Sequence, residues 1–146
     1  MTTNTREFDF SAMVCFSLYS TSNAMIREYR PQLKEFDLTY PQFLVMMSLW
    51  NEDTVFIKAL SEETCFDSGT LTPVLKRLEG KGYIQRDKSV EDERARVIKL
   101  TEQGKALKQK TSHIFSNMQC KVMLTEQEQL AINTICKKIS SSLQDK

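Results

Sequence analysis

Residues 67–83 read DSGTLTPVLKRLEGKGY, and this stretch has the features of one short helix with a defined beginning and end. Asp67 is a suitable N-cap, because its carboxylate can accept hydrogen bonds from the unpaired N–H groups of the first turn. Gly80 and Gly82 favour termination of the helix. The apolar residues between them fall at helical spacing and predict a single buried face: Leu71, Val74, Leu75 and Leu78.

The polar side of this helix carries short side chains first and cations later, namely Ser68, Thr70, Thr72, Lys76 and Arg77. Short polar groups near a helix N-terminus can approach base edges and phosphates closely. The pattern therefore indicates a helix that enters a groove of nucleic acid. An ordinary amphipathic surface helix would show the same pattern, and the flanking residues decide between these two readings.

The flanking residues predict a second, shorter helix and a charged hairpin. Before the central stretch, residues 55–57 have strand character and residues 59–65 suggest a brief helix. After it, residues 83–86 and 94–100 read as two strands joined by the charged turn 87–93, with an uncertain register. Two helices followed by such a hairpin occur in this order in the winged helix-turn-helix.

Positive charge is concentrated in this part of the chain. The formal net charge of +1 argues neither for nor against a nucleic-acid partner. Residues 1–67 carry 5 basic and 10 acidic side chains, whereas residues 68–108 carry 10 basic and 6 acidic ones. A solvated hairpin tip would also be charged. However, Asp92 is placed to brace Arg94, and we expect DNA contacts from the hairpin residues Arg86, Asp92, Arg94 and Arg96.

Long helical patterns lie on both sides of this region, over about residues 9–29, 39–50, 101–123 and 125–143. Pro31 should break or redirect the chain after the first of them. The first helix and the last two have apolar faces that their own chain is too short to cover. A two-fold homodimer is therefore expected to bury these faces.

Composition supports one mainly helical domain with a small β-wing. Of the 146 residues, 40% are hydrophobic and 27% are charged, and only three prolines and four glycines occur. We expect a cytoplasmic protein without a membrane partner, because no signal-peptide core and no run of about 18 apolar residues are present. The four cysteines lack CxxC spacing and His113 is the only histidine, so neither a metal nor another cofactor is expected.

The chain resembles the MarR family of winged-helix repressors over nearly its whole length. The match rests on DSGTLTP at residues 67–73, on DER at 92–94, and on the positions that follow them: Leu75, Leu78, Gly82, Val97, Leu100, Thr101 and Gly104. The resemblance implies a single MarR-type domain over residues 1–146. It places the winged helix-turn-helix at about 54–100 and the dimerisation helices at about 9–36 and 101–146. It also implies a homodimer on double-stranded DNA with an inverted-repeat operator.

Within the family, the chain is similar to the branch that senses organic hydroperoxides. This narrower match rests on CFSLYS at residues 15–20, YRP at 29–31 and LTYPQ at 38–42. The resemblance implies that Cys15 is the peroxide-reactive thiol, that Tyr29 and Tyr40 stabilise its thiolate, and that Tyr19 contributes less. In some members of the branch a second cysteine resolves the first across the dimer, which implies that role for Cys120. Elsewhere in the branch a small thiol could take its place.

Apart from the family, a cysteine on an amphipathic helix is usually a small buried hydrophobe. Tyr19 shares a helix face with Cys15, whereas Tyr29 lies roughly 21 Å farther along a continuous helix and could meet Cys15 only across a dimer. Cys120 lies in a polar stretch that suits a reactive thiol. The remaining two cysteines are expected in the core, at positions 65 and 136.

Three functions are compatible with these residues. The first is a dimeric repressor that senses organic hydroperoxides by oxidation of Cys15 and then releases its operator. The second is a thiol peroxidase with Cys15 as nucleophile, since thiolate attack would give the same sulfenic acid. The third is a MarR-type repressor that responds to a non-oxidising aromatic ligand. A peroxidase has no use for Arg94 on a basic hairpin, so we expect a repressor and not an enzyme.

Overall fold

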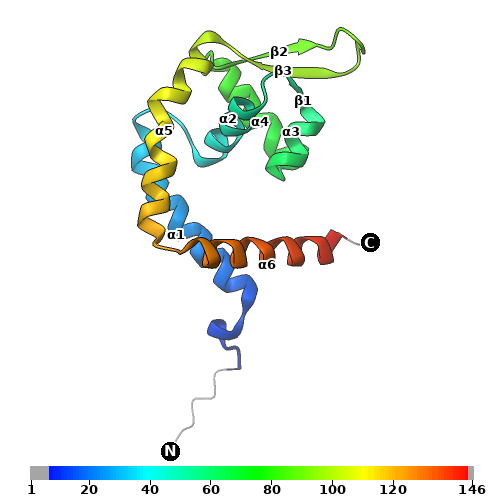
Figure 1. Ribbon diagram of the computed structural model, residues 1–146. Coiled ribbons are helices and arrows are strands. Elements are labelled where there is room, and N and C mark those ends of the chain that lie inside the picture. Colours follow the sequence, from blue (N-terminus) through cyan, green and yellow to red (C-terminus); the bar gives the residue numbers. More distant parts are fainter. Residues whose placement is uncertain (1–6, 145–146) are drawn as a thin grey trace, which may run out of the picture. The chain divides into compact units, whose positions relative to one another are not determined.

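The computed structural model describes residues 7–144. Its elements are η1 (Phe10–Ala12), α1 (Val14–Lys34), α2 (Tyr40–Asn51), β1 (Val55–Phe56), α3 (Ile57–Thr64), α4 (Ser68–Gly80), β2 (Ile84–Lys88), β3 (Arg96–Leu100), α5 (Glu102–Val122) and α6 (Glu126–Gln144). The mainly helical fold with a small β-wing is confirmed (Figure 1). The described residues pack as two compact units, which divide between Ile114 and Phe115 inside α5.

The core of the first unit forms around α2 and α4. Thr39 caps α2 as expected, and it forms a capping box with Gln42 in which each side chain bonds the other residue's backbone N–H. Seven apolar side chains of the two helices are at most 1% exposed: Phe43, Val45, Met46, Leu49, Leu71, Leu75 and Leu78. Val74, which was expected in the same buried face, is only half-buried. This shared core fixes the position of α4 against α2.

The three strands form one antiparallel sheet in the order β1-β3-β2. Ile84 pairs with Leu100 and Arg86 pairs with Ile98, which settles the register that the sequence left open. Ile84, Ile98 and Leu100 are all buried, so burial of one face selects this register over a slip by one residue. Figure 1 shows the β2–β3 hairpin extending from the helices α2, α3 and α4.

The expected break at Pro31 is wrong, because α1 continues through this residue to Lys34. Proline inside a helix costs about 3 kcal/mol, since it removes a donor and crowds the preceding turn. The last turn of α1 is nevertheless held in the core. Leu33 is 1% exposed, and its carbonyl oxygen accepts hydrogen bonds from the N–H groups of Phe36 and Leu38. Burial of one leucine contributes about 1.5–3 kcal/mol, which largely offsets the proline.

Apolar side chains remain uncovered at both ends of the chain. In and before α1 the exposed ones are Phe8, Phe10, Met13, Val14, Phe16, Leu18, Tyr19 and Met25; in and before α6 they are Met123, Leu124, Leu130, Ile132, Ile135 and Leu143. Such extended apolar faces are typical of helices that are buried by another copy of the chain. Among residues 7–144, no helix is long and apolar enough to cross a membrane.

Candidate functional site

The helix α4 presents its polar residues outward, as its sequence predicts. The carboxylate of Asp67 accepts a hydrogen bond of 2.7 Å from the backbone N–H of Thr70 and so caps the helix. The side chains expected to reach DNA are all exposed on this helix: Ser68, Thr70, Thr72, Lys76 and Arg77. The free N–H groups of the first turn and the helix dipole both favour an anion at this end. The arrangement suits contact with a phosphate backbone, and the individual contacts stay predictions.

The tip of the hairpin is a defined turn and not a loose loop. The hydroxyl of buried Ser89 accepts hydrogen bonds from the backbone N–H groups of Glu91 and Asp92, at 3.2 and 3.3 Å. Asp92 in turn accepts a 2.9 Å hydrogen bond from the N–H of Arg94, so it braces the backbone of this residue. The Arg94 side chain is exposed and has no partner among residues 7–144. The turn therefore holds its guanidinium out toward solvent.

Arg86, which was also expected to contact DNA, has a partner within the chain. Its guanidinium donates two hydrogen bonds to the Glu79 carboxylate, at 3.0 and 3.2 Å, and lowers the pKa of that carboxyl group. The pair connects β2 to the last turn of α4. Its place in DNA binding stays a prediction, and the structure shows a role that the sequence did not reveal.

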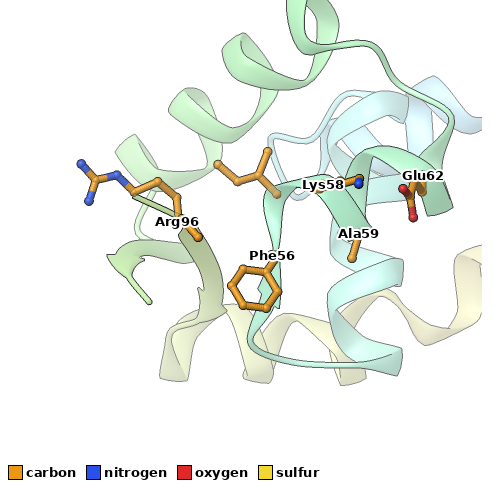
Figure 2. A pocket seen from close by; sticks show the side chains of 7 residues that line it. Phe56, Lys58, Ala59, Glu62 and Arg96 are labelled. Atoms are coloured by element: carbon orange, nitrogen blue, oxygen red, sulfur yellow. The ribbon is translucent and has the colours of Figure 1, made fainter. Parts of the chain in front are cut away.

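A hollow of about 480 Å³ lies where α3 begins beside β1 and the first residue of β3. Figure 2 shows Phe56, Lys58 and Glu62 around it, while the guanidinium of Arg96 extends away from them. The polar groups do not converge on one point, so this hollow lacks the arrangement of a small-molecule site. It leaves Arg96 directed to solvent at the edge of the hairpin.

Tyr29 and Tyr40 form a tilted ring pair where α1 passes the start of α2. Their ring centroids are 4.8 Å apart, and Tyr29 is 6% exposed. Burial raises the pKa of both phenols, and for Tyr29 the neighbouring Tyr40 adds to the effect. Both therefore keep the hydroxyl proton at neutral pH. Within residues 7–144, neither hydroxyl has a hydrogen-bond partner, so two donors remain available.

Cys15 lies in the first turn of α1, exposed and on the same uncovered apolar face as Tyr19. Because α1 is continuous, Tyr29 is about 21 Å away along the helix axis. The expected sensing residues therefore fall into two groups within one chain, Cys15 with Tyr19 and Tyr29 with Tyr40. Cys120 belongs to the second compact unit, on α5, where it is exposed.

The two other cysteines differ from expectation. Cys65 was expected in the core, but it is exposed. It ends α3 with a left-handed φ of 59°, and this backbone turns its thiol outward, 3.8 Å from the carbonyl oxygen of Glu62. Cys136 is half-buried on α6. In the part of the chain that the structure describes, no three His, Cys, Asp or Glu side chains gather into a metal-binding group.

A second hollow of about 480 Å³ lies beside Tyr40 and was not anticipated from the sequence. Its cations come from two parts of the chain, Arg30 and Lys34 on α1 and Lys81 after α4. Arg30 and Lys34 are four residues apart and share a helix face, which is a local signal. The approach of Lys81 is a long-range contact that no local pattern could reveal.

Comparison with known proteins places these features in a family. The family model described as transcriptional regulator SarA/Rot matches residues 27–111. The organic hydroperoxide resistance transcriptional regulator of Bacillus subtilis is 46% identical over 101 residues, which are 69% of either chain. The HTH-type transcriptional regulator SarZ of Staphylococcus aureus is 46% identical over 104 residues, 71% of this chain and 70% of SarZ.

Solved structures agree with the sequence matches. Reduced AbfR bound to DNA superposes with a TM-score of 0.75 at 28% identity, covering 90% of this chain and 92% of AbfR. The disulfide form of AbfR gives a TM-score of 0.63 at 32% identity over 86% of this chain and 89% of AbfR. The chain therefore belongs to the SarA/Rot family of transcriptional regulators, and it is a MarR-type winged-helix protein of the organic hydroperoxide-sensing branch.

Proposed function

We propose that this protein is a homodimeric repressor that binds an inverted-repeat operator and releases it when an organic hydroperoxide oxidises Cys15. One observation carries the proposal. The hydroxyls of Tyr29 and Tyr40 keep their protons and have no acceptor within residues 7–144. Such donors suit a thiolate supplied by another chain.

A two-fold dimer would supply that thiolate. We assign the dimer interface to residues 9–36 and 101–146 and the DNA-binding part to residues 54–100. The uncovered apolar face around Cys15 supports this assignment, because such a face is removed from water only when another protein surface covers it. If the α1 helices of two protomers run past each other, Cys15 of one protomer meets the tyrosine pair of the other.

The DNA-binding half of the proposal rests on α4 and the hairpin. Two α4 helices related by the dimer axis would enter successive major grooves, with half-sites about 10 bp apart or a multiple of that. Arg94 at each hairpin tip would reach the adjacent minor groove or its phosphates. AbfR, which was solved on DNA, supports this half.

The sensing step is a two-electron oxidation of sulfur. The Cys15 thiolate attacks one peroxide oxygen, the S–O bond forms, and the O–O bond breaks. The alcohol leaves as an alkoxide that takes up a proton, and Cys15 becomes a sulfenic acid. The hydroxyls of Tyr29 and Tyr40 hydrogen-bond to the thiolate and so favour the reactive form.

The conformational change follows in a second step. A sulfenic acid adds a single oxygen atom, which is a small perturbation of an interface. Condensation with the thiol of Cys120 expels water and forms a disulfide, whose Cα atoms must lie within about 7 Å. Since α5 follows directly after β3, movement of α5 would shift the hairpin and the two α4 helices. The disulfide form of AbfR supports this route.

Operator binding before and after treatment with an organic hydroperoxide tests the proposal. Wild type should lose affinity and regain it with dithiothreitol, whereas Cys15→Ser should keep its affinity throughout. Cys65→Ser is the matched control, since that thiol is also exposed but lies at the end of α3, outside the proposed dimer interface. Equal release from wild type and Cys15→Ser would refute the sensing role.

The same samples separate the other two functions. A sensor consumes hydroperoxide in nearly stoichiometric amounts, whereas a thiol peroxidase would consume a many-fold excess. Release by a non-oxidising aromatic ligand, undiminished in Cys15→Ser, would favour a ligand-responsive repressor.

A further inference from the structure

The side chain of Lys81 connects the end of α4 to the turn before α2. Its ammonium group donates to the carbonyl oxygen of Asp37 and, at 3.0 Å, to the side-chain oxygen of Gln42. The Asp37 carboxylate lies 3.5 Å away and completes an ion pair. The three N–H donors of a lysine thus meet three acceptors, two on Asp37 in the turn between α1 and α2 and one on Gln42 in the first turn of α2.

The backbone of Lys81 belongs firmly to α4. It is the C-cap residue of that helix, and its N–H group bonds to the carbonyl oxygens of Arg77 and Glu79. Gly82 follows with a φ of 79°, a conformation that ends the helix abruptly. The contacts of the ammonium group therefore tie the last turn of α4 to Asp37 and Gln42.

At its other end, the contact reaches the residues that position Tyr40. Gln42 is 2% exposed, and the same side-chain oxygen that binds Lys81 also accepts the N–H of Thr39, at 3.2 Å. This capping box encloses Tyr40, which is the first helical residue of α2. Lys81 is thus bonded directly to the capping box that holds the backbone of Tyr40 at the start of α2.

We propose that Lys81 is a positioning residue that couples the oxidation state of Cys15 to the orientation of α4. The proposal rests on the function above, in which Tyr40 of one protomer holds the thiolate of the other. When oxidation removes that thiolate, the first turn of α2 relaxes. The hydrogen bonds of Lys81, which depend on distance and angle, pass this change to α4, whereas apolar contacts between the helices tolerate small shifts.

Lys81→Met tests the coupling, because it keeps the length and apolar part of the side chain and removes only the ammonium group. Gln42 remains satisfied by Thr39, so the fold should persist. The reduced variant should bind operator within about twofold of wild type and lose its Cys15 thiol to hydroperoxide at the wild-type rate. The ratio of the oxidised to the reduced Kd should fall by roughly two- to thirtyfold, the range of coupling effects along such contacts.

Two further variants complete the test. Lys105→Met removes another lysine from an ion pair, with Glu102 at 3.4 Å, where both side chains are exposed on α5, and should leave the ratio unchanged. Asp37→Asn keeps a residue that tolerates the φ of 53° and removes a carboxylate whose side chain is 90% exposed. Asp37→Asn should also lower the ratio of the oxidised to the reduced Kd, but by a smaller factor than Lys81→Met. If Lys81→Met does not fold, Asp37→Asn decides whether the Lys81 contacts couple oxidation to α4.

The outcomes separate the two proposals. If wild type shows no release, or releases without needing Cys15, the proposed function fails. If wild type behaves as proposed but Lys81→Met and Asp37→Asn keep its ratio, only the coupling role is overturned. Loss of reduced and oxidised binding by the same factor would show that Lys81 contacts DNA or merely supports the fold, and would also overturn the coupling role.

Discussion

Gly104→Ala should destabilise the protein strongly, because the first turn of α5 touches the backbone before β2 at this residue. A Cβ atom on Gly104 would lie 2.1 Å from the carbonyl oxygen of Tyr83 and 3.2 Å from a methyl group of Leu100. The carbonyl oxygen of Tyr83 cannot turn away, since it accepts the N–H of Thr101. The carbonyl oxygen of Gly104 itself accepts the indole N–H of Trp50 at 2.9 Å.

The magnitude follows from three contributions. Forcing an extra carbon into a packed site costs up to about 3 kcal/mol where the neighbour is backbone. Displacing α5 also weakens the hydrogen bond from Trp50, which contributes about 1 kcal/mol. Alanine gains back roughly 1 kcal/mol of helix propensity. We therefore expect a loss of about 3 kcal/mol in the free energy of unfolding, or roughly 10 °C in Tm for a chain of this size.

Urea and thermal unfolding of the reduced protein, compared at equal protein concentration, measure this loss. Gly80→Ala is the matched control. This residue is also helical, and nothing lies within 4 Å of an added Cβ. The control should be as stable as wild type or slightly more stable. If Gly104→Ala unfolds at the same urea concentration and temperature as Gly80→Ala, the packing argument at the start of α5 is refuted.

Three further predictions concern function. Arg94→Ala should weaken operator binding by about 1–3 kcal/mol if the side chain reaches base edges, or lower the salt dependence of binding by about one unit of slope if it reaches only phosphate. Fluorescence anisotropy across salt concentrations distinguishes these outcomes, and unchanged affinity would contradict the role of the hairpin tip. Cys120→Ser should abolish the covalent dimer of oxidised protein on a non-reducing gel, and Cys136→Ser should leave it; persistent dimers with reversible release in Cys120→Ser would exclude Cys120 as the resolving thiol. Tyr29→Phe and Tyr40→Phe should each slow hydroperoxide-dependent loss of the Cys15 thiol without changing operator binding by the reduced protein, and wild-type rates in both would remove the tyrosines from the sensing step.

Much of the DNA-binding part could be predicted from local sequence. The bounds of α4 follow from a carboxylate cap at Asp67, leucines at helical spacing and a glycine after the last turn, all of which act within a few residues. The same holds for the Thr39 cap of α2 and for the order of helices and strands. In these segments, local preference and tertiary packing favour the same structure.

Other features depend on partners far away in the chain. Pro31 stays helical because Leu33 is buried, and the strand register is selected by burial of Ile84 against the core. Cys65 is exposed because its left-handed backbone turns the thiol away, although it was expected in the core. Local propensity cannot account for such cases, since the deciding energy comes from contacts that form only when the fold closes.

The candidate site shows the same division. Cys15, Tyr29 and Tyr40 could be named from the sequence, but only the structure shows that the two tyrosine rings lie 4.8 Å apart while Cys15 stays separate on the same continuous helix as Tyr29. The contact of Lys81 with Gln42 joins residues 39 positions apart. No periodic pattern records such a pairing, because a side chain's partner is chosen by the packing of whole helices. The sequence by itself determined which groups can react, and the tertiary structure decided which of them can act on one another.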